Sequence, residues 1–421
     1  MKNNIKFKET NISWVGVIPI DWNLIKAKYL FNQIKEINYD LKCKNLLSLT
    51  YDGVLNKDYY ANEGLRPENY NTYQIFDKDD LVFKMIDLEN VKTSRVGIVH
   101  EYGIMSSAYI RFAPIKDKIY PKFTYWFFYD LYKKEIYNSL GSGVRSTLSS
   151  HDMSEFEIPL PRVEEQVIIS NYLDKKTIEI DLLIKKIEKK IELLKEKKNS
   201  LIKEVVTKGL NSKITNKESG VEWIKKVPKH WKILKLKYIA KITYGISPSE
   251  ETYNDNEEGT VLVNGPSEYS VAEFGFTRSI KWTTDPKKIV PKGCLLFCVR
   301  ASVGRMNIAH QDLSIGRGVC AIEANMDQDY LVYSMMVVSL YIKDKISGSV
   351  FPSVTKDDVD NFIIPNPPLE EQKKISEFLT FQVSKINKNR ELHLKQINLL
   401  KEYRLTLISS VISGKVKVSE K

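Results

Sequence analysis

The sequence contains two long stretches without the residues that interrupt a helix. Neither glycine nor proline occurs between Arg162 and Lys208, or between Leu369 and Ser413. Glycine costs about 1 kcal/mol and proline about 3 kcal/mol inside a helix, so their absence favours long helices. A helix of about ten turns can therefore run unbroken in each stretch.

Cysteine is also scarce. The four cysteines, at positions 43, 294, 298 and 320, are too few and too scattered for a disulfide framework. Cys294 and Cys298 are separated by three residues, but no second pair or nearby histidine completes a tetrahedral zinc set. We therefore expect a reducing environment, no metal site, and a core strand around these two cysteines.

Long apolar runs are missing as well. Residues 1–10 are polar and charged, unlike the apolar core of a signal peptide, and the longest apolar run, 330–342, is too short to span a bilayer. These features predict a cytoplasmic protein without a membrane partner.

The usual motifs of catalytic and cofactor sites do not occur. The chain has no phosphate-binding G-x4-G-K-[ST], no G-x-G-x-x-G after a strand, no H-E-x-x-H and no G-x-S-x-G. The segment Asn366-Pro-Pro-Leu369 superficially resembles the Asn-Pro-Pro-aromatic site of adenine methyltransferases, but leucine replaces the aromatic residue. We interpret it as a helix start, with Glu370 and Glu371 at the positive end of the helix dipole. The sequence thus predicts no catalysis and no cofactor in this chain.

Positive charge, in contrast, is abundant. The chain of 421 residues carries 64 lysines and arginines against 53 aspartates and glutamates, a net charge of +11. Such an excess favours a polyanionic partner such as nucleic acid. The length allows two or three domains with ordinary cores.

A heptad seam runs along each uninterrupted stretch. The first extends from Leu173 to Val205, and adding 206 to its positions gives the second, from Leu379 to Val411. This period predicts coiled-coil packing. The pattern alone is also typical of a dimerisation rod or adaptor, but one chain supplies both helices, so we expect an intramolecular pair. The seam residues that we assign to this pair or to a partner are Ile180, Ile184, Ile187, Ile191, Leu194, Leu201, Arg390, His393, Ile397, Leu400, Arg404 and Leu407.

The repeat extends beyond the helices. A W-x4-P-x2-W motif at Trp14 to Trp22 recurs at Trp223 to Trp231, and DMSEFEIPLPRVEEQ before the first helix matches DVDNFIIPNPPLEEQ before the second. Ahead of these stand GSGV, with Ser142, and SGSV, with Gly348. The chain therefore reads as two copies of one unit, related by a pseudo-twofold axis. Because the second Trp motif follows the first helix, we expect the N-terminal one to lie near the end of the second helix.

Four segments follow from this repeat: residues 1–160 and 211–366 as two globular regions, and residues 161–210 and 367–421 as the two long helices. Both globular regions show short strand-like runs and one helix candidate, at 123–132 and 330–342. The expected fold class is α+β: two mixed α/β globular regions joined by two long antiparallel helices. The two regions differ strongly in sequence, which suggests two different recognition modules on one scaffold.

Candidate nucleic-acid contacts are the residue types that read base edges or bind phosphates. Arginine and asparagine can read guanine and adenine bidentately, lysine and tyrosine can contact phosphates, and backbone beside glycine can approach them closely. In the first region these are Lys57, Tyr59, Tyr60, Arg66, Asn69, Tyr70, Lys84, Arg95 and Arg145. In the second region they are Asn264, Arg278, Lys281, Arg300, Ser302, Arg305, Arg317 and Ser353.

Taken in this order, the motifs resemble those of the specificity subunits of type I restriction-modification systems, over essentially the whole chain. The resemblance rests on the doubled Trp motif, the glycine-serine turns and the doubled EEQ helix start. In the second region it also rests on Arg300-Ala-Ser-Val-Gly304 and Gly316-Arg-Gly318. In the first it rests on Leu47-Ser-Leu-Thr50 with Asp52-Gly-Val54, and on Gly103-Ile-Met-Ser106 with Ala108-Tyr109.

The resemblance implies two target recognition domains that each read one half of a bipartite DNA target, with the helices fixing the gap. It further implies two modification subunits as partners, which carry S-adenosylmethionine and methylate adenine N6. Restriction subunits that use ATP and Mg²⁺ would join them for cleavage. Polar seam residues such as Lys198, Arg390, His393 and Arg404 are candidates for docking these partners.

Overall fold

The computed structural model describes residues 6–58, 69–89, 93–141, 146–270, 275–300, 302–346 and 353–418. The chain divides into two units, one of residues 1–187 with 394–421, and the other of residues 188–393. Each unit combines one globular region with half of each long helix. We call residues 6–162 the first head and residues 209–368 the second head.

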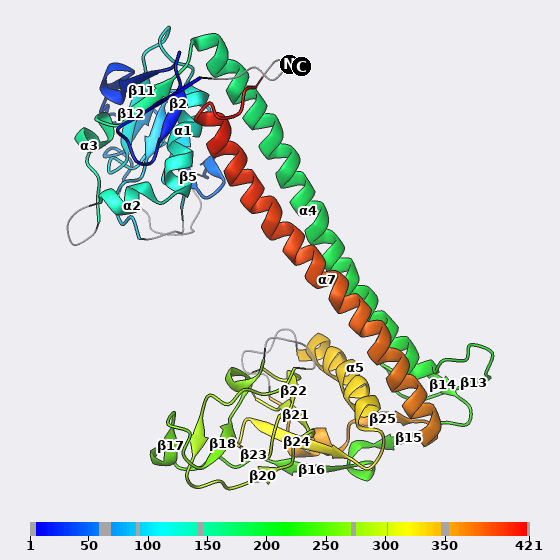
Figure 1. The fold of residues 1–421 in the computed structure, drawn as a ribbon. Coiled ribbons are helices and arrows are strands. Elements are labelled where there is room, and N and C mark those ends of the chain that lie inside the picture. Colours follow the sequence, from blue (N-terminus) through cyan, green and yellow to red (C-terminus); the bar gives the residue numbers. More distant parts are fainter. Residues whose placement is uncertain are drawn as a thin grey trace. The chain divides into compact units, whose positions relative to one another are not determined.

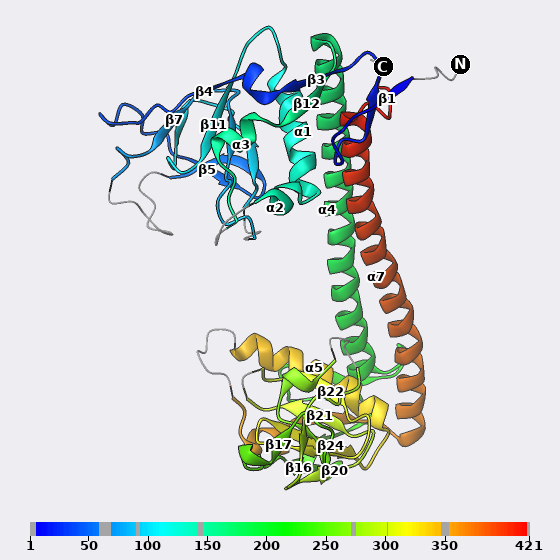
Figure 2. The ribbon, with the colours of Figure 1, turned by 60° about the vertical axis from the view of Figure 1, so that its left-hand side comes forward.

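Two helices dominate the chain: α4, Val163–Lys208, and α7, Leu369–Ile412. They contain 46 and 44 residues, so each is about 66 to 69 Å long at about 1.5 Å per residue. Both exceed the ten turns expected from the sequence, since α4 begins two residues after Pro161 and α7 begins directly after Pro368. The two helices run side by side in opposite directions (Figure 1, Figure 2).

The heptad seam is the buried stripe of this helix pair. In the first unit, Leu173 and Val411 are fully buried; in the second, Leu379 is fully buried and Val205 nearly so. The outer faces carry exposed charged residues and also exposed apolar side chains, among them Leu182, Phe381 and Leu399. The expected intramolecular coiled coil is therefore confirmed.

The first head is built on a four-stranded antiparallel sheet covered by helix α1, Pro121–Lys133. The sheet order is β4 (Phe31–Gln33), β11 (Ile110–Pro114), β8 (Leu81–Phe83) and β9 (Val96–Ile98). The two-stranded pairs are β1 (Phe7–Glu9) with β2 (Val17–Pro19), β3 (Asn23–Lys26) with β12 (Glu157–Leu160), β5 (Leu47–Thr50) with β6 (Gly53–Asn56), and β7 (Gln74–Phe76) with β10 (Gly103–Met105). Short helices α2 (Ile136–Leu140) and α3 (Ser150–Ser154) complete it.

The second head contains two larger sheets. A four-stranded sheet orders β16 (Ala240–Tyr244), β24 (Val319–Ala324), β21 (Leu295–Cys298) and β22 (Met306–Ile308). A five-stranded sheet orders β17 (Tyr253–Asn254), β19 (Trp282–Thr283), β18 (Thr260–Val263), β23 (Leu313–Ile315) and β20 (Ile289–Val290). Two pairs remain, β13 (Asn216–Glu218) with β14 (Lys226–Pro228) and β15 (Lys232–Lys235) with β25 (Ile363–Asn366). Helix α5 (Gln328–Ile346) packs between the four-stranded sheet and the long helices (Figure 1). Helix α6 (Lys356–Asp360) precedes β25.

The doubled motif before each long helix forms the same structure in both units. Ser149 caps α3 and Thr355 caps α6, and in each case the aspartate three residues later completes a capping box. The following segments, expected only as helix starts, also contain strands: β12 pairs with β3, and β25 with β15. Their prolines are tolerated because each strand lies in a two-stranded pair and has a free edge.

Each long helix ends against a Trp motif. Gly209 and Gly414 end α4 and α7 in the left-handed conformation that favours glycine, with φ of 74° and 70°. A Cβ at Gly209 would lie 3.1 Å from the Trp231 ring, and one at Gly414 would press on Pro19 and Trp22. The end of the second helix thus contacts the N-terminal Trp motif, as the repeat predicts.

Candidate nucleic-acid interface

A glutamine that recurs in both units fixes each head to the start of its long helix. Gln166 accepts a hydrogen bond from the backbone N–H of Tyr120, at 2.7 Å, and Gln372 accepts one from that of Asp327, at 3.0 Å. Each side chain also donates to the carbonyl of a proline just before its own helix. Both are nearly fully buried. The bonds place the N-terminus of α1, or of α5, in one orientation on the long helix.

The glutamate before Gln372 anchors the second Trp motif. Glu371 accepts hydrogen bonds from Trp231 Nε1, at 2.8 Å, and from His230 Nε2, at 2.6 Å. Trp231 is fully buried. The repeated EEQ therefore joins the Trp motif, the head and the long helix at one point.

Three candidates of the second head gather where strands β18 and β23 end. Asn264 Nδ2 lies 3.4 Å from the hydroxyl of Tyr253, and Lys281 Nζ lies 5.3 Å from the centre of the same ring. The side chain of Arg317 is exposed, and its backbone N–H donates to Ser247 Oγ at 3.1 Å. The group offers an amide, an ammonium and a guanidinium.

The glycines beside Arg317 are required by the protein itself. A Cβ at Gly316 would collide with the Asn264 side chain, and one at Gly318 with the Asn264 carbonyl oxygen. The sequence predicts that such glycines let a phosphate approach the backbone. In the structure they instead allow Asn264 to pack against the turn between β23 and β24.

A second group of candidates lies in the loop after β21. The backbone of Arg300 bridges to Ser353, the N–H of Ser302 donates to the Arg300 carbonyl at 2.6 Å, and that of Arg305 donates to the Ser302 carbonyl at 3.0 Å. Gly304, with φ of 80°, allows the tight turn. Arg300, Arg305 and Ser353 are all exposed, so this loop carries two exposed arginines.

Two candidate arginines donate to carbonyl groups of their own head. Arg95 is buried, and its guanidinium donates to the carbonyls of Ile86, at 3.0 Å, and Asp87. The guanidinium therefore stabilises the turn at Ile86 and Asp87, and its burial argues against a contact with DNA. Arg278 Nη2 donates to the Ser267 carbonyl at 2.7 Å but is exposed and keeps other donors free.

The remaining first-head candidates are less tightly grouped. Lys57 and Asn69 are exposed, Tyr70 stacks edge-on with Tyr73, and Lys84 donates to the hydroxyl of Thr93 at 3.1 Å. Four further candidates lie outside the described residues: Tyr59, Tyr60, Arg66 and Arg145. The glycine-serine turns at 142–144 and 348–350 and Ala301 also lie outside them.

The apolar seam candidates face the interior of the helix pair. Those that are nearly fully buried are Ile180, Ile184, Ile187, Ile397 and Leu407, and those that are partly buried are Ile191, Leu194, Leu201 and Leu400.

The polar seam candidates divide into inner and outer residues. Arg404 bonds to Asp181 and to the Tyr129 hydroxyl within the first unit. Lys198 is 3% exposed. These two therefore face the protein interior, which is one of the two placements that the sequence left open for them. Arg390 is exposed and His393 half-exposed, so both remain candidates for docking.

Sequence reasoning missed a cluster on α1 that joins the first head to α7. The ammonium of Lys133 lies 4.6, 5.3 and 4.4 Å from the ring centres of Tyr51, Tyr129 and Tyr132, respectively. Tyr129 in turn accepts a hydrogen bond from Arg404. The spacing of Tyr129 and Lys133, four residues apart on a helix rich in aromatic residues, could have indicated this contact.

The described residues contain no group of three or more potential metal ligands. None of their helices is long and apolar enough to cross a membrane. The geometry thus offers hydrogen-bond donors, cations and aromatic rings, which suit recognition of a polyanion.

Comparison with known proteins matches this architecture. The family model for the type I restriction modification DNA specificity domain matches twice, at residues 17–193 and 228–397. Each match spans one head and most of the long helix that follows it.

Two relatives illustrate the range of similarity. The putative type I restriction enzyme MjaX specificity subunit of Methanocaldococcus jannaschii is 29% identical, over 98% of this chain and 97% of its own. The type I restriction enzyme EcoBI specificity subunit of Escherichia coli is 22% identical, over 54% of this chain and 52% of its own.

Solved structures share the fold. A chain from a study of complex assembly and conformational transition of the type I R-M system aligns with a TM-score of 0.78 and 17% identity, covering 95% of this chain and 99% of that one. The HsdS subunit from Thermoanaerobacter tengcongensis aligns with a TM-score of 0.57 and 17% identity, covering 95% and 98%. Because the family model matches more than half of the chain, in two copies that follow its internal repeat, the chain belongs to the family of type I restriction-modification DNA specificity subunits.

Proposed function

We propose that each head reads one half of a bipartite duplex target and that the helix pair sets the gap between the halves. The observation that carries this proposal is the doubled scaffold with unlike heads. The same helix start, Trp motif and strand pair occur in both units, whereas the sheets differ: four strands with small pairs in the first head, four and five strands in the second. One scaffold with two different recognition surfaces suits a target of two different parts.

The residues that would contact DNA are the exposed and half-buried candidates of each head. In the second head, Arg300 and Arg305 on one loop, and Asn264, Lys281 and Arg317 at the ends of β18 and β23, combine base-reading and phosphate-binding groups. In the first head, the candidates of this kind are Lys57, Asn69, Tyr70 and Lys84.

We further propose that this chain performs no catalysis and binds its modification subunits through the long helices. S-adenosylmethionine would then be held by the modification subunits, and ATP and Mg²⁺ by restriction subunits. The exposed seam residues Arg390 and His393 are the candidates for this docking.

Selection from randomised duplexes tests the proposal. The chain, co-purified with its modification subunit, should select two short sequence elements at one fixed gap. Replacing residues 232–357 with the second head of a relative should change one element and leave the other unchanged. Selection of no sequence would favour the alternative, a coiled-coil adaptor that does not read DNA. Methyl transfer or cleavage by the purified chain alone would contradict the absence of catalysis.

A further inference from the structure

The two units differ where the head packs on the helix pair. In the first unit, Arg404 of α7 bonds to both carboxylate oxygens of Asp181 on α4, and to the hydroxyl of Tyr129 on α1. The Tyr129 ring also lies 5.9 Å from the guanidinium carbon. A cation is thus neutralised within the junction.

The repeat identifies the corresponding positions of the second unit. A shift of 206 places Lys198 at the position of Arg404 and Asn387 at that of Asp181. The bonds of Gln166 to Tyr120 and of Gln372 to Asp327 align the head helices with a shift of 207, which places Met336 at the position of Tyr129. The second unit therefore has an asparagine and a methionine at the positions that hold the carboxylate and the phenol of the first.

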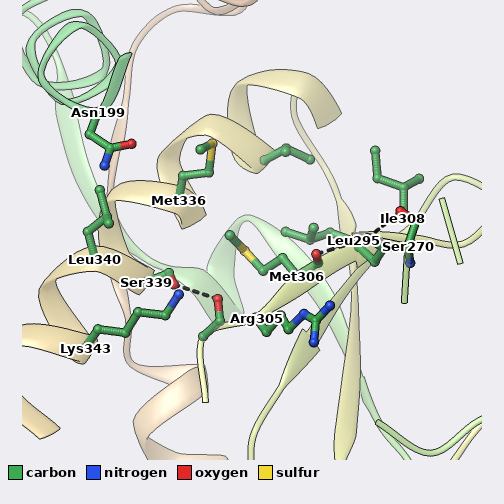
Figure 3. A pocket seen from close by; sticks show the side chains of 13 residues that line it. Asn199, Ser270, Leu295, Arg305, Met306, Ile308, Met336, Ser339, Leu340 and Lys343 are labelled. Atoms are coloured by element: carbon green, nitrogen blue, oxygen red, sulfur yellow. Dashed lines mark hydrogen bonds between the residues drawn. The ribbon is translucent and has the colours of Figure 1, made fainter. Parts of the chain in front are cut away.

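A cavity of about 130 Å³ occupies the second junction. Its walls come from α4, α5 and the region around β22, and include Asn199, Met336, Leu340, Lys343 and Arg305 (Figure 3). Ser339 also lines the cavity, but its hydroxyl is engaged with the carbonyl of Gly304, at 2.6 Å. The polar groups of the lining are the Asn199 amide, the Lys343 ammonium and the Arg305 guanidinium, together with Ser270 and Asn307.

Positively charged side chains surround this cavity. Burial, and then the neighbouring Lys195 and Arg305, lower the pKa of Lys343. Lys195 precedes Asn199 by one helical turn and so lies on the same face of α4. Burial, Arg390 and Lys195 likewise lower the pKa of Lys198 to about 8. Arg305 and Lys343 thus line one cavity, and their repulsion, with that of Lys195, disfavours the charged form of Lys343.

Three cations of this group, Lys195, Arg305 and Lys343, make no ion pair within 4.0 Å in the part of the chain that the structure describes, and all three are exposed. Assembling like charges costs free energy unless an anion arrives from outside. The arrangement suits an anion supplied by a partner.

We propose that Lys195, Arg305 and Lys343 form a clamp for backbone phosphates of duplex DNA, beside the half-site that the second head reads. The inference rests on the proposed function. Arg305 lies on the same loop as Arg300 and Ser302, so an anion held by the clamp adjoins the candidate base-reading surface. A guanidinium and two ammonium groups from three elements fit the spaced charges of a nucleic-acid backbone, which phosphate contacts position without reading sequence.

The salt dependence of DNA binding tests the clamp. We would compare the complex of this chain and its modification subunit with the same complex carrying Lys195→Met, Arg305→Met and Lys343→Met, singly and together. Methionine retains much of the aliphatic stem, and a thermal melt would verify folding. Lys213→Met, an exposed lysine of the linker after α4, is the control for loss of charge alone.

Each phosphate contact contributes about 0.9 to the slope of log affinity against log salt concentration. The triple variant should lower that slope by about 2.7, so between about 50 and 200 mM salt it should lose roughly 40-fold less affinity than the parent. The loss of affinity at low salt should be equal for specific and non-specific duplexes, and the selected half-sites should not change.

Other outcomes overturn the clamp. A slope equal to that of Lys213→Met would show that these cations contact no phosphate. Loss of co-purification with the modification subunit at an unchanged slope would assign them to an acidic protein surface. If the parent complex itself bound no duplex specifically, the proposed function would be wrong. If the parent bound its target and the variants showed the same salt dependence as the parent, only the clamp would be wrong.

Discussion

Arg404 and Asp181 form a bidentate pair, with Nε 3.0 Å from Oδ1 and Nη2 3.2 Å from Oδ2. The pair joins α7 to α4 within the first unit, and the Tyr129 hydroxyl extends it to the first head. A charged seam position that the sequence assigns either to the twin helix or to a partner thus binds the twin helix. Planar, two-bond pairing of this kind is stronger and more specific than a single contact.

Arg404→Met should destabilise the protein by about 1 kcal/mol, because a charge-assisted bidentate pair is lost at a position where Asp181 is still half-exposed. The urea midpoint would measure this. Asp181→Asn should add little in the Arg404→Met background, since the partner is already gone. The matched control is Arg390→Met, an exposed arginine of the same seam, which should cost nothing. Equal losses at both arginines would contradict a special role for the pair.

Lys198 should make stability depend on pH in the alkaline range. Its pKa in the folded protein is about 8, mainly because of burial and then because of Arg390 and Lys195, and is lower than the usual value of 10.5. Between these values the unfolded chain binds more protons than the folded one, so stability rises with pH.

The comparison is between the parent and Lys198→Met. The free energy of unfolding of the parent, minus that of the variant, should increase as pH rises from about 8 to above 10, with no such trend below pH 7. Denaturation at several pH values would measure it. A difference that stayed constant with pH would show that Lys198 keeps an ordinary pKa.

Gly209 ends α4 at φ of 74° beside the Trp231 ring, and Gly220 has a similar φ of 73° with no atom within 4 Å of the place that a Cβ would take. Alanine at either position should cost about 1 kcal/mol for the left-handed backbone. Gly209→Ala should cost more, because its Cβ would lie 3.1 Å from Trp231. Thermal melts of the two variants isolate the contribution of the Trp contact, and identical losses would argue that the ring gives way freely.

The helix pair should act as the ruler of the target. Duplicating residues 188–194 in α4 and 387–393 in α7 preserves the heptad seam and lengthens each helix by about 10.5 Å, the rise of about three base pairs. Methylation assays on duplexes with varied gaps should then prefer a longer gap and the same half-sites. Changed half-sites with an unchanged gap would contradict this division of roles.

The sequence predicted what is periodic or repeated. The seams of α4 and α7, the doubled helix starts and the contact between the end of α7 and Trp22 all follow from spacing. The expected helices appear as α1 and α5, and the expected strand at Cys294 as β21. Three features could not be predicted: the pairing of Arg404 with Asp181, the burial of Arg95, and the glycines that leave room for Asn264. Each depends on contacts between residues far apart in the sequence, and the spacing of residues along the chain does not indicate such contacts.

The account depends most on the claim that two heads read two half-sites at one gap. Adenine methylation, mapped across the DNA of cells with and without this gene, tests it most directly. The account predicts one family of methylated sites that appears only with the gene, each made of two constant elements separated by a constant number of variable bases. A single continuous motif, or two elements at variable separation, would contradict it.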